Sequence, residues 1–161
     1  MINDIELGKR LLALKIIWIV IFISLAIYLF IGLQFIKEMQ ISVDDKAIVI
    51  IKPVLYVLAF ITFIMTGIFR KFLLSVKKQQ VQTGDNYQEN IIQKYTVAVI
   101  ASLALSESIG IYGLVLFFLG KNTTDLYLLI LISAAAMLMY RPSKDEIISL
   151  SEASTTGGAP A

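Results

Sequence analysis

Four long runs of apolar residues alternate with charged segments along this chain. The runs cover residues 14–35, 47–69, 95–119 and 123–140. A helix needs roughly 20 residues to cross about 30 Å of hydrocarbon, and each run comes close to that length. The pattern predicts an all-α, polytopic membrane protein, with four transmembrane helices in residues 1–148. Residues 149–161 are small and polar and predict a disordered C-terminal tail.

Composition supports a membrane location and excludes several kinds of chemistry. Hydrophobic residues make up 58% of the chain and charged residues 16%, whereas a soluble domain carries roughly a quarter charged residues. The mean hydropathy is +0.81. The chain has no Cys and no His, which removes disulfides, thiol chemistry and the usual transition-metal ligands. With no catalytic motif present, we expect no enzyme, no cofactor and no nucleic-acid partner.

The distribution of Lys and Arg predicts the orientation. With four spans, the N-terminus, the second loop and the C-terminus share one side of the membrane. That side carries ten basic residues, and the other side carries four. By the positive-inside rule both termini are cytoplasmic. The first run is too long for a signal peptide and is expected to stay as a helix, and we expect the protein in the bacterial inner membrane.

One acidic residue, Glu107, lies at membrane depth, in the middle of the third run. An ionised carboxylate there costs from a few to more than ten kcal/mol, depending on the scale, so some compensation is required. Protonation is the cheapest compensation, because a neutral carboxyl can donate a hydrogen bond and exchange its proton with water. A bound cation, held by carboxylate, hydroxyl and carbonyl oxygens, is the second. In the third interpretation, Glu107 is structural and hydrogen-bonds a neighbouring helix.

Small residues around this acid predict close helix packing. In the third run they recur at Ala98, Ser102, Ser106 and Gly110, and Gly113 extends the same face. The fourth run carries Ser133, Ala134 and Ala135 near its middle, followed by Ala136. Because the loop between these runs has about six residues, we expect them to pair as an antiparallel hairpin.

The tripeptide Asn122-Thr123-Thr124 matches a glycosylation acceptor. It lies against the membrane end, in a short loop. We therefore interpret it as a polar cluster that caps the fourth helix.

The residues around Glu107 resemble a known family. The segment from Glu107 to Val115, ESIGIYGLV, preceded by Leu103-Ala104-Leu105-Ser106, resembles the second helix of the c subunit, or proteolipid, of rotary F-type ATP synthases. The resemblance covers residues 93–119. In that family the helix follows a cytoplasmic loop, runs outward and carries the carboxylate that takes up H⁺ or Na⁺. The orientation predicted here agrees with that arrangement.

The resemblance implies roles for particular residues. It is to the sodium-binding members, and it implies that Glu107, Ser108 and the Leu105 carbonyl bind the ion while Tyr112 supports the carboxylate. The helix before the loop departs from the family. It has one glycine, Gly67, and bulky aromatic residues where the family has a run of glycines. We therefore do not expect this chain to form the tight inner ring of that family.

Two hypotheses of different classes follow from the sequence. In the first, the chain is a small membrane subunit that binds or transfers H⁺ or Na⁺ at Glu107, within a larger complex or a homo-oligomer. No metal cluster is expected, and Na⁺ at Glu107 is the one cation considered. In the second, the chain is a non-catalytic accessory or scaffold protein in which Glu107 is structural. In both, its partners are the lipid bilayer and other membrane subunits.

Overall fold

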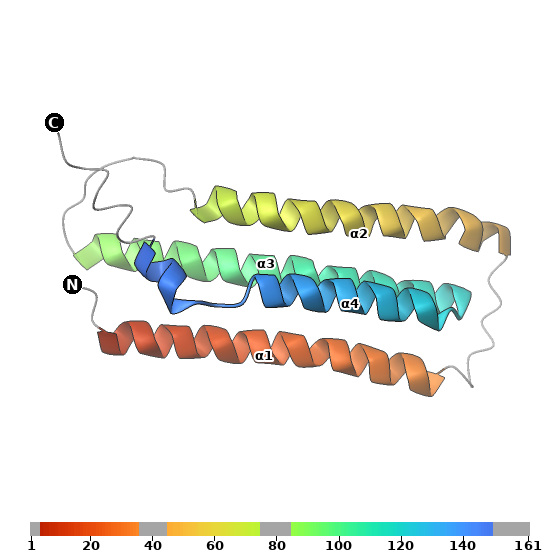
Figure 1. Cartoon of the computed structure of the whole chain (residues 1–161), viewed down its shortest axis with the longest axis horizontal. Coiled ribbons are helices and arrows are strands. Elements are labelled where there is room, and N and C mark those ends of the chain that lie inside the picture. The colour runs from red at the N-terminus through yellow and green to blue at the C-terminus, as the bar shows by residue number, and fades with distance from the viewer. Residues whose placement is uncertain (1–3, 36–44, 75–84, 150–161) are drawn as a thin grey trace.

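The computed structural model describes residues 4–35, 45–74 and 85–149, and this part of the chain is helical apart from short connections (Figure 1). Its main elements are α1 (Asp4–Phe35), α2 (Asp45–Leu74), α3 (Asp85–Gly120) and α4 (Thr123–Met139). The predicted all-α class is confirmed. The expected tail, residues 149–161, lies outside the described residues except for Ser149.

Three of the helices are long and apolar enough to cross a membrane. The stretches that meet this condition are Gly8–Gln34, Lys46–Leu74 and Ile92–Gly120. The fourth helix, α4, is apolar but has only 17 residues. At 1.5 Å per residue it is about 25 Å long, slightly less than the hydrocarbon thickness.

The helices run alternately up and down, with α3 and α4 in the middle and α1 and α2 on either side (Figure 1). Of the four helices, α3 packs most extensively against the others, because it contacts α1, α2 and α4. Its central position explains why α3 carries more fully buried residues than the flanking helices, among them Val99, Leu103 and Ile109. Glu107 therefore belongs to the helix that every other helix touches.

The hairpin between α3 and α4 is defined by its backbone. Lys121 has a left-handed backbone with a φ of 51°, and its N–H donates to the Phe117 carbonyl at 2.8 Å, which ends α3. The side chain of Asn122 then accepts a hydrogen bond from the Thr124 N–H at 3.0 Å and caps α4. The predicted capping role of Asn122 is confirmed.

The first helix, α1, joins the bundle through one buried seam. Leu11, Leu14 and Leu25 are buried, whereas many of its other large apolar side chains are exposed. Trp18 lies on the same seam, and its indole N–H donates to the Met137 carbonyl at 2.9 Å. That carbonyl is in the last turn of α4, where helical carbonyls lack an N–H partner within the helix. The exposed apolar faces of α1 and α2 are what a bilayer would cover.

After α4 the chain folds back over the end of the bundle. Tyr140 caps α4, Pro142 is buried, and residues 144–149 form a short further helix. Within that helix Ile147 is 1% exposed and joins the core cluster that contains Leu11, Leu14 and Tyr95. The segment that follows α4 is thus part of the packed structure.

Candidate functional site

Glu107 lies at the interface between α3 and α1. Its Oε1 accepts hydrogen bonds from Ser24 Oγ at 2.6 Å and from Tyr28 Oη at 2.8 Å. Ser24 and Tyr28 are four residues apart, so both side chains lie on one face of α1. We call Ser24, Tyr28 and Glu107 the Glu107 site.

The two hydroxyls at this site have fewer hydrogens than the contacts around them require. Ser24 Oγ lies 2.6 Å from Glu107 Oε1 and also 2.6 Å from the Ile21 carbonyl oxygen of its own helix. A serine hydroxyl carries one hydrogen and can donate to one of these oxygens at a time. If Ser24 donates to Ile21, as Ser and Thr often do within helices, a hydrogen on the carboxyl would satisfy the short contact between Ser24 and Glu107 as well.

A small residue allows α1 to approach this acid. Gly110 is one turn after Glu107, and a Cβ added to it would lie 2.7 Å from Leu25 Cδ2 on α1. It would also lie 3.4 Å from Ser133 Oγ on α4. Gly110 is therefore packed against two helices, and α1 approaches closely enough for Ser24 and Tyr28 to reach the carboxyl.

The other residues that the resemblance assigned to ion binding lie elsewhere. Ser108 Oγ donates to the Ala104 carbonyl at 3.0 Å. Tyr112 packs on the cluster that contains Ala59 and Ile109, and Leu105 lines a surface groove against α2. Residues five apart on a helix are separated by about 140° around its axis, so Tyr112 and Glu107 face different neighbours. Among the residues that the structure describes, the carboxyl receives its hydrogen bonds from α1.

The small residues singled out for helix packing lie mostly at the α3–α4 contact. Ala98, Ser102, Ser106 and Ser133 are fully buried. Ser133 Oγ donates to the Ser106 carbonyl at 2.6 Å, which joins α4 to α3 one residue before Glu107.

At Gly113 an added Cβ would lie 2.9 Å from Leu129 Cβ, so its close contact is also with α4. On α4, the face that packs against α3 contains Ser133 and the fully buried Ala136, which are three residues apart. Ala134 is half-buried, and Ala135 is exposed on the other side of the helix.

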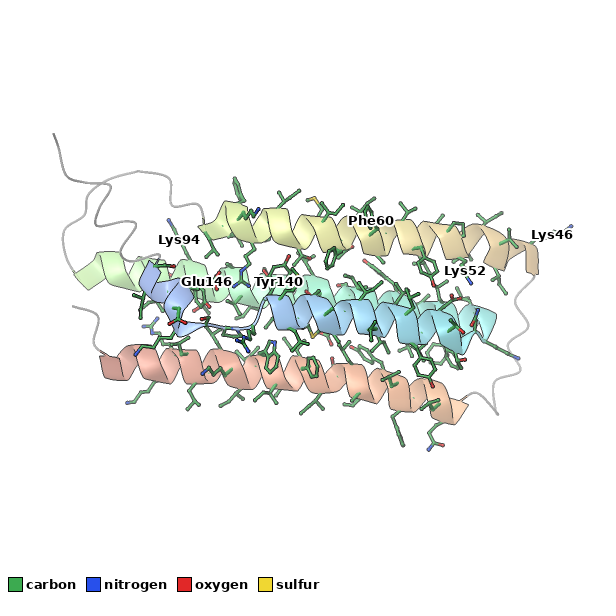
Figure 2. The ribbon with its side chains drawn as sticks, viewed as in Figure 1. Lys46, Lys52, Phe60, Lys94, Tyr140 and Glu146 are labelled. Carbon is green, nitrogen blue, oxygen red and sulfur yellow. The ribbon has the colours of Figure 1, made fainter. Side chains whose placement is uncertain are left out.

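A second polar cluster lies at the end of the bundle where α2 ends and α3 begins. We call it the basic-end cluster; its members are Arg70, Tyr95, Tyr140, Ser143 and Glu146. The Arg70 guanidinium forms a bidentate ion pair with Glu146, donates to the Tyr140 carbonyl at 3.1 Å and lies 5.2 Å from the Tyr140 ring centroid. Figure 2 shows Tyr140 and Glu146 at this end.

Tyr95 completes the basic-end cluster. Its hydroxyl donates to Glu146 Oε2 and the Ser143 carbonyl, both at 3.2 Å, and accepts from the Ser143 N–H at 3.0 Å. Because one hydroxyl hydrogen serves two acceptors, these are alternatives or a shared bond. The cluster joins the segment after α4 to α2 and α3.

A third polar cluster lies at the opposite end of the bundle. The carboxylate of Asp125, in the first turn of α4, lies 2.8 Å from Lys52 Nζ and accepts from Tyr56 Oη at 2.7 Å. Asp125 is buried, whereas 40% of the Lys52 side chain is exposed. Figure 2 shows Lys52 reaching from α2 toward this end of α4. An acid at a helix N-terminus is also favoured by the helix dipole.

Sequence reasoning missed the residues of α1 that contact Glu107. A signal for them exists, because Ser24 and Tyr28 are the hydroxyl pair at helical spacing in the middle of an otherwise apolar span. Nothing in the sequence places that pair opposite Glu107 rather than toward lipid. The pairing of Arg70 with Glu146 could not be predicted from the sequence either, because the two residues are 76 positions apart.

The fold and the site define a helical protein with a hydroxyl-bonded carboxyl between two apolar helices. Comparisons with known protein families, with curated proteins and with solved structures find no match to this chain. The resemblance of residues 93–119 to the c subunit of rotary ATP synthases stays a prediction from the sequence.

Proposed function

We propose that this chain is a four-helix integral membrane subunit whose Glu107 binds and releases a proton at the α1–α3 interface. In this proposal α4 is the fourth span, both termini are cytoplasmic and the membrane is the bacterial inner membrane. The alternating direction of the helices supports an even number of crossings (Figure 1). The concentration of Lys and Arg at one end supports the orientation.

The hydrogen count at Ser24 carries the proposal of a proton at Glu107. A neutral carboxyl donates to Ser24 Oγ, leaves the Ser24 hydrogen for the Ile21 carbonyl and still accepts from Tyr28. All three contacts, at 2.6, 2.6 and 2.8 Å, are then satisfied together. A neutral group also avoids the cost of placing a charge at membrane depth. A proton held this way leaves when the carboxyl meets water or a basic group of a partner.

The arrangement favours a proton over a sodium ion within this chain. A cation site needs several oxygen lone pairs directed at one point. Tyr28 directs its hydrogen at the carboxyl, and Ser108 directs its hydrogen at the Ala104 carbonyl. Sodium binding in the manner that the resemblance implies requires ligands contributed by a second copy or by another subunit.

One observation favours the second candidate, a structural role. Ser24 and Tyr28 lie 83 and 79 positions before Glu107, so the same hydrogen bonds join α1 to α3. In that case the chain is a membrane scaffold, and the carboxyl serves as a donor and acceptor that an amide can replace. The two candidates differ in whether the proton exchanges.

Labelling with dicyclohexylcarbodiimide tests the proposal, because this reagent adds to protonated carboxyls that lie in an apolar environment. We expect mass spectrometry to locate the adduct on Glu107 in native membranes and to find none in Glu107→Gln. Glu146 is the internal control, because it pairs with the Arg70 guanidinium at the end of the bundle and lies outside the apolar stretches. Protection of Glu107 by Na⁺ but not by K⁺ would favour sodium.

An infrared measurement separates exchange from a fixed structural proton. The C=O stretch of a protonated carboxylic acid should be present in the wild type, absent in Glu107→Gln and titrate reversibly with pH. If the wild-type protein neither labels at Glu107 nor shows a titrating band, the proton-exchange proposal is wrong and the structural role is the candidate that remains. Normal assembly and partner binding by Glu107→Gln is expected under both candidates, and activity of the complex is lost only under the first.

A further inference from the structure

An apolar groove runs along the outer surface between α2 and α3. It has a volume of about 410 Å³ and is lined by Met65, Phe69, Ala101, Ala104 and Leu105. The two alanines make the hollow, because their short side chains leave room between the larger side chains of α2. Met65 is 48% exposed and Phe69 is 39% exposed, so the groove is open along its length.

Both walls of the groove continue toward the basic end of the bundle. On α3, Val97 and Lys94 lie four and seven residues before Ala101, which places all three on one face of the helix. On α2, Phe72 follows Met65 by seven residues and Phe69 by three. Val97 and Phe72 are exposed apolar residues that prolong the two walls.

Lys94 stands where this surface reaches the membrane boundary. Its side chain is exposed, and it has no ion-pair partner among the residues that the structure describes. The same holds for Lys71, which is exposed on the adjacent last turn of α2. Figure 2 shows Lys94 beside the end of α2. Lys94 prolongs the α3 wall of the groove and has no acid paired with it among the described residues, so this end of the groove complements a ligand with an anionic head and an apolar chain.

We propose that the groove between α2 and α3 binds one acyl chain of an anionic phospholipid, whose phosphate pairs with Lys94. Lys94 lies about 10 Å along the helix axis from Ala101, which matches a headgroup at the interface above an acyl chain in the groove. A lysine ammonium suits a phosphate as a point charge on a flexible stem. Basic residues at a membrane surface attract anionic lipids, and each Lys near the surface strengthens that attraction about fivefold.

Fluorescence quenching by brominated lipids tests this site. Trp18 is the one tryptophan of the chain, so a Trp18→Phe background leaves Phe69→Trp as a reporter in the groove wall. We expect dibromo-acyl phosphatidylglycerol, as a minor component of phosphatidylcholine vesicles, to quench this reporter about fivefold more effectively than dibromo-acyl phosphatidylcholine. Phe60→Trp, on an exposed part of α2 outside the groove lining, should be quenched equally by both lipids.

Charge variants identify the head-group contact. Lys94→Gln should abolish the preference for phosphatidylglycerol at the groove reporter, whereas Lys121→Gln at the other end of α3 should leave it intact. Ala104→Phe, which fills the groove, should abolish the preference even with Lys94 present. Equal quenching by the two lipids, or a preference that survives Lys94→Gln, would overturn the proposal.

A second measurement needs no tryptophan reporter. Native mass spectrometry of the wild-type chain released from detergent should show phosphatidylglycerol retained in preference to phosphatidylcholine with the same acyl chains. Lys94→Gln should lose this preference while circular dichroism and elution volume stay unchanged. Equal retention of the two lipids by the wild type would also overturn the proposal.

Discussion

The hydroxyl of Ser24 lies 2.6 Å from the carboxyl oxygen of Glu107, although 83 positions separate the two residues. This contact joins α1 to α3 near the middle of their long apolar stretches. It also gives Glu107, the one acidic residue within the apolar stretch Ile92–Gly120, a partner on another helix. The consequences of this pairing, and of the other contacts that hold the helices together, are open to test.

We expect Ser24→Ala and Tyr28→Phe each to lower the free energy of unfolding by about 0.5–2 kcal/mol, because each removes one hydrogen bond between helices. Ser108→Ala is the matched control, because its hydroxyl bonds within α3 and its loss should change stability by less than about 0.5 kcal/mol. Thermal or denaturant unfolding in one detergent measures all three. Equal costs for Ser24→Ala and Ser108→Ala would argue against the interhelical bond.

Gly113→Ala should destabilise the bundle by about 1–3 kcal/mol. The added methyl would lie 2.9 Å from Leu129 Cβ and 3.4 Å from the Leu126 carbonyl, so α3 and α4 would have to separate. The same substitution at Gly8 meets nothing within 4 Å and should stabilise by up to about 1 kcal/mol through helix propensity. The unfolding midpoints of the two variants should therefore move in opposite directions. A neutral Gly113→Ala would contradict the close α3–α4 contact.

Loss of the Arg70–Glu146 pair should release the helix at residues 144–149. Ile147 is 1% exposed, so a cysteine introduced there should react slowly with a thiol reagent. Arg70→Met should raise that rate at least about fivefold, because hydrogen bonds to a charged group contribute about 1 kcal/mol or more. Lys71→Met removes a neighbouring exposed cation and should leave the rate unchanged. Equal rates in Arg70→Met and in the parent would show that Ile147 packing holds the segment without the ion pair.

The proposed orientation can be checked with single cysteines, because the chain has none of its own. In intact cells Lys121→Cys should react with a membrane-impermeant thiol reagent, and Lys144→Cys should react only after the membrane is opened. The reason is that the end carrying Lys144 has most of the Lys and Arg and should stay in the cytoplasm. The reverse pattern would exclude the orientation. Reaction at both positions in intact cells would exclude α4 as a span.

The sequence by itself determined the helical class and the apolar runs on which the four helices are built, and it showed that most Lys and Arg lie on one side of those runs. These follow from composition and local pattern, because a run of apolar residues near 20 long has few alternatives to a helix in a membrane. The cap at Asn122 was predictable for the same local reason. Glu107 was identifiable as a candidate because an acid in such a run is costly wherever its partners are.

Only the tertiary structure decided which groups meet Glu107. The 3.6-residue period puts Ser108 and Tyr112 on other faces of α3, while the order of the helices places Ser24 and Tyr28 of α1 opposite the carboxyl. Arg70 and Glu146 meet for a similar reason, because α4 ends at Tyr140 and the chain turns back over the end of the bundle, where Arg70 of α2 reaches Glu146. Contacts between residues far apart depend on which helix faces pack together, and that is decided by the fit of whole surfaces, such as Gly110 against Leu25, rather than by any local pattern.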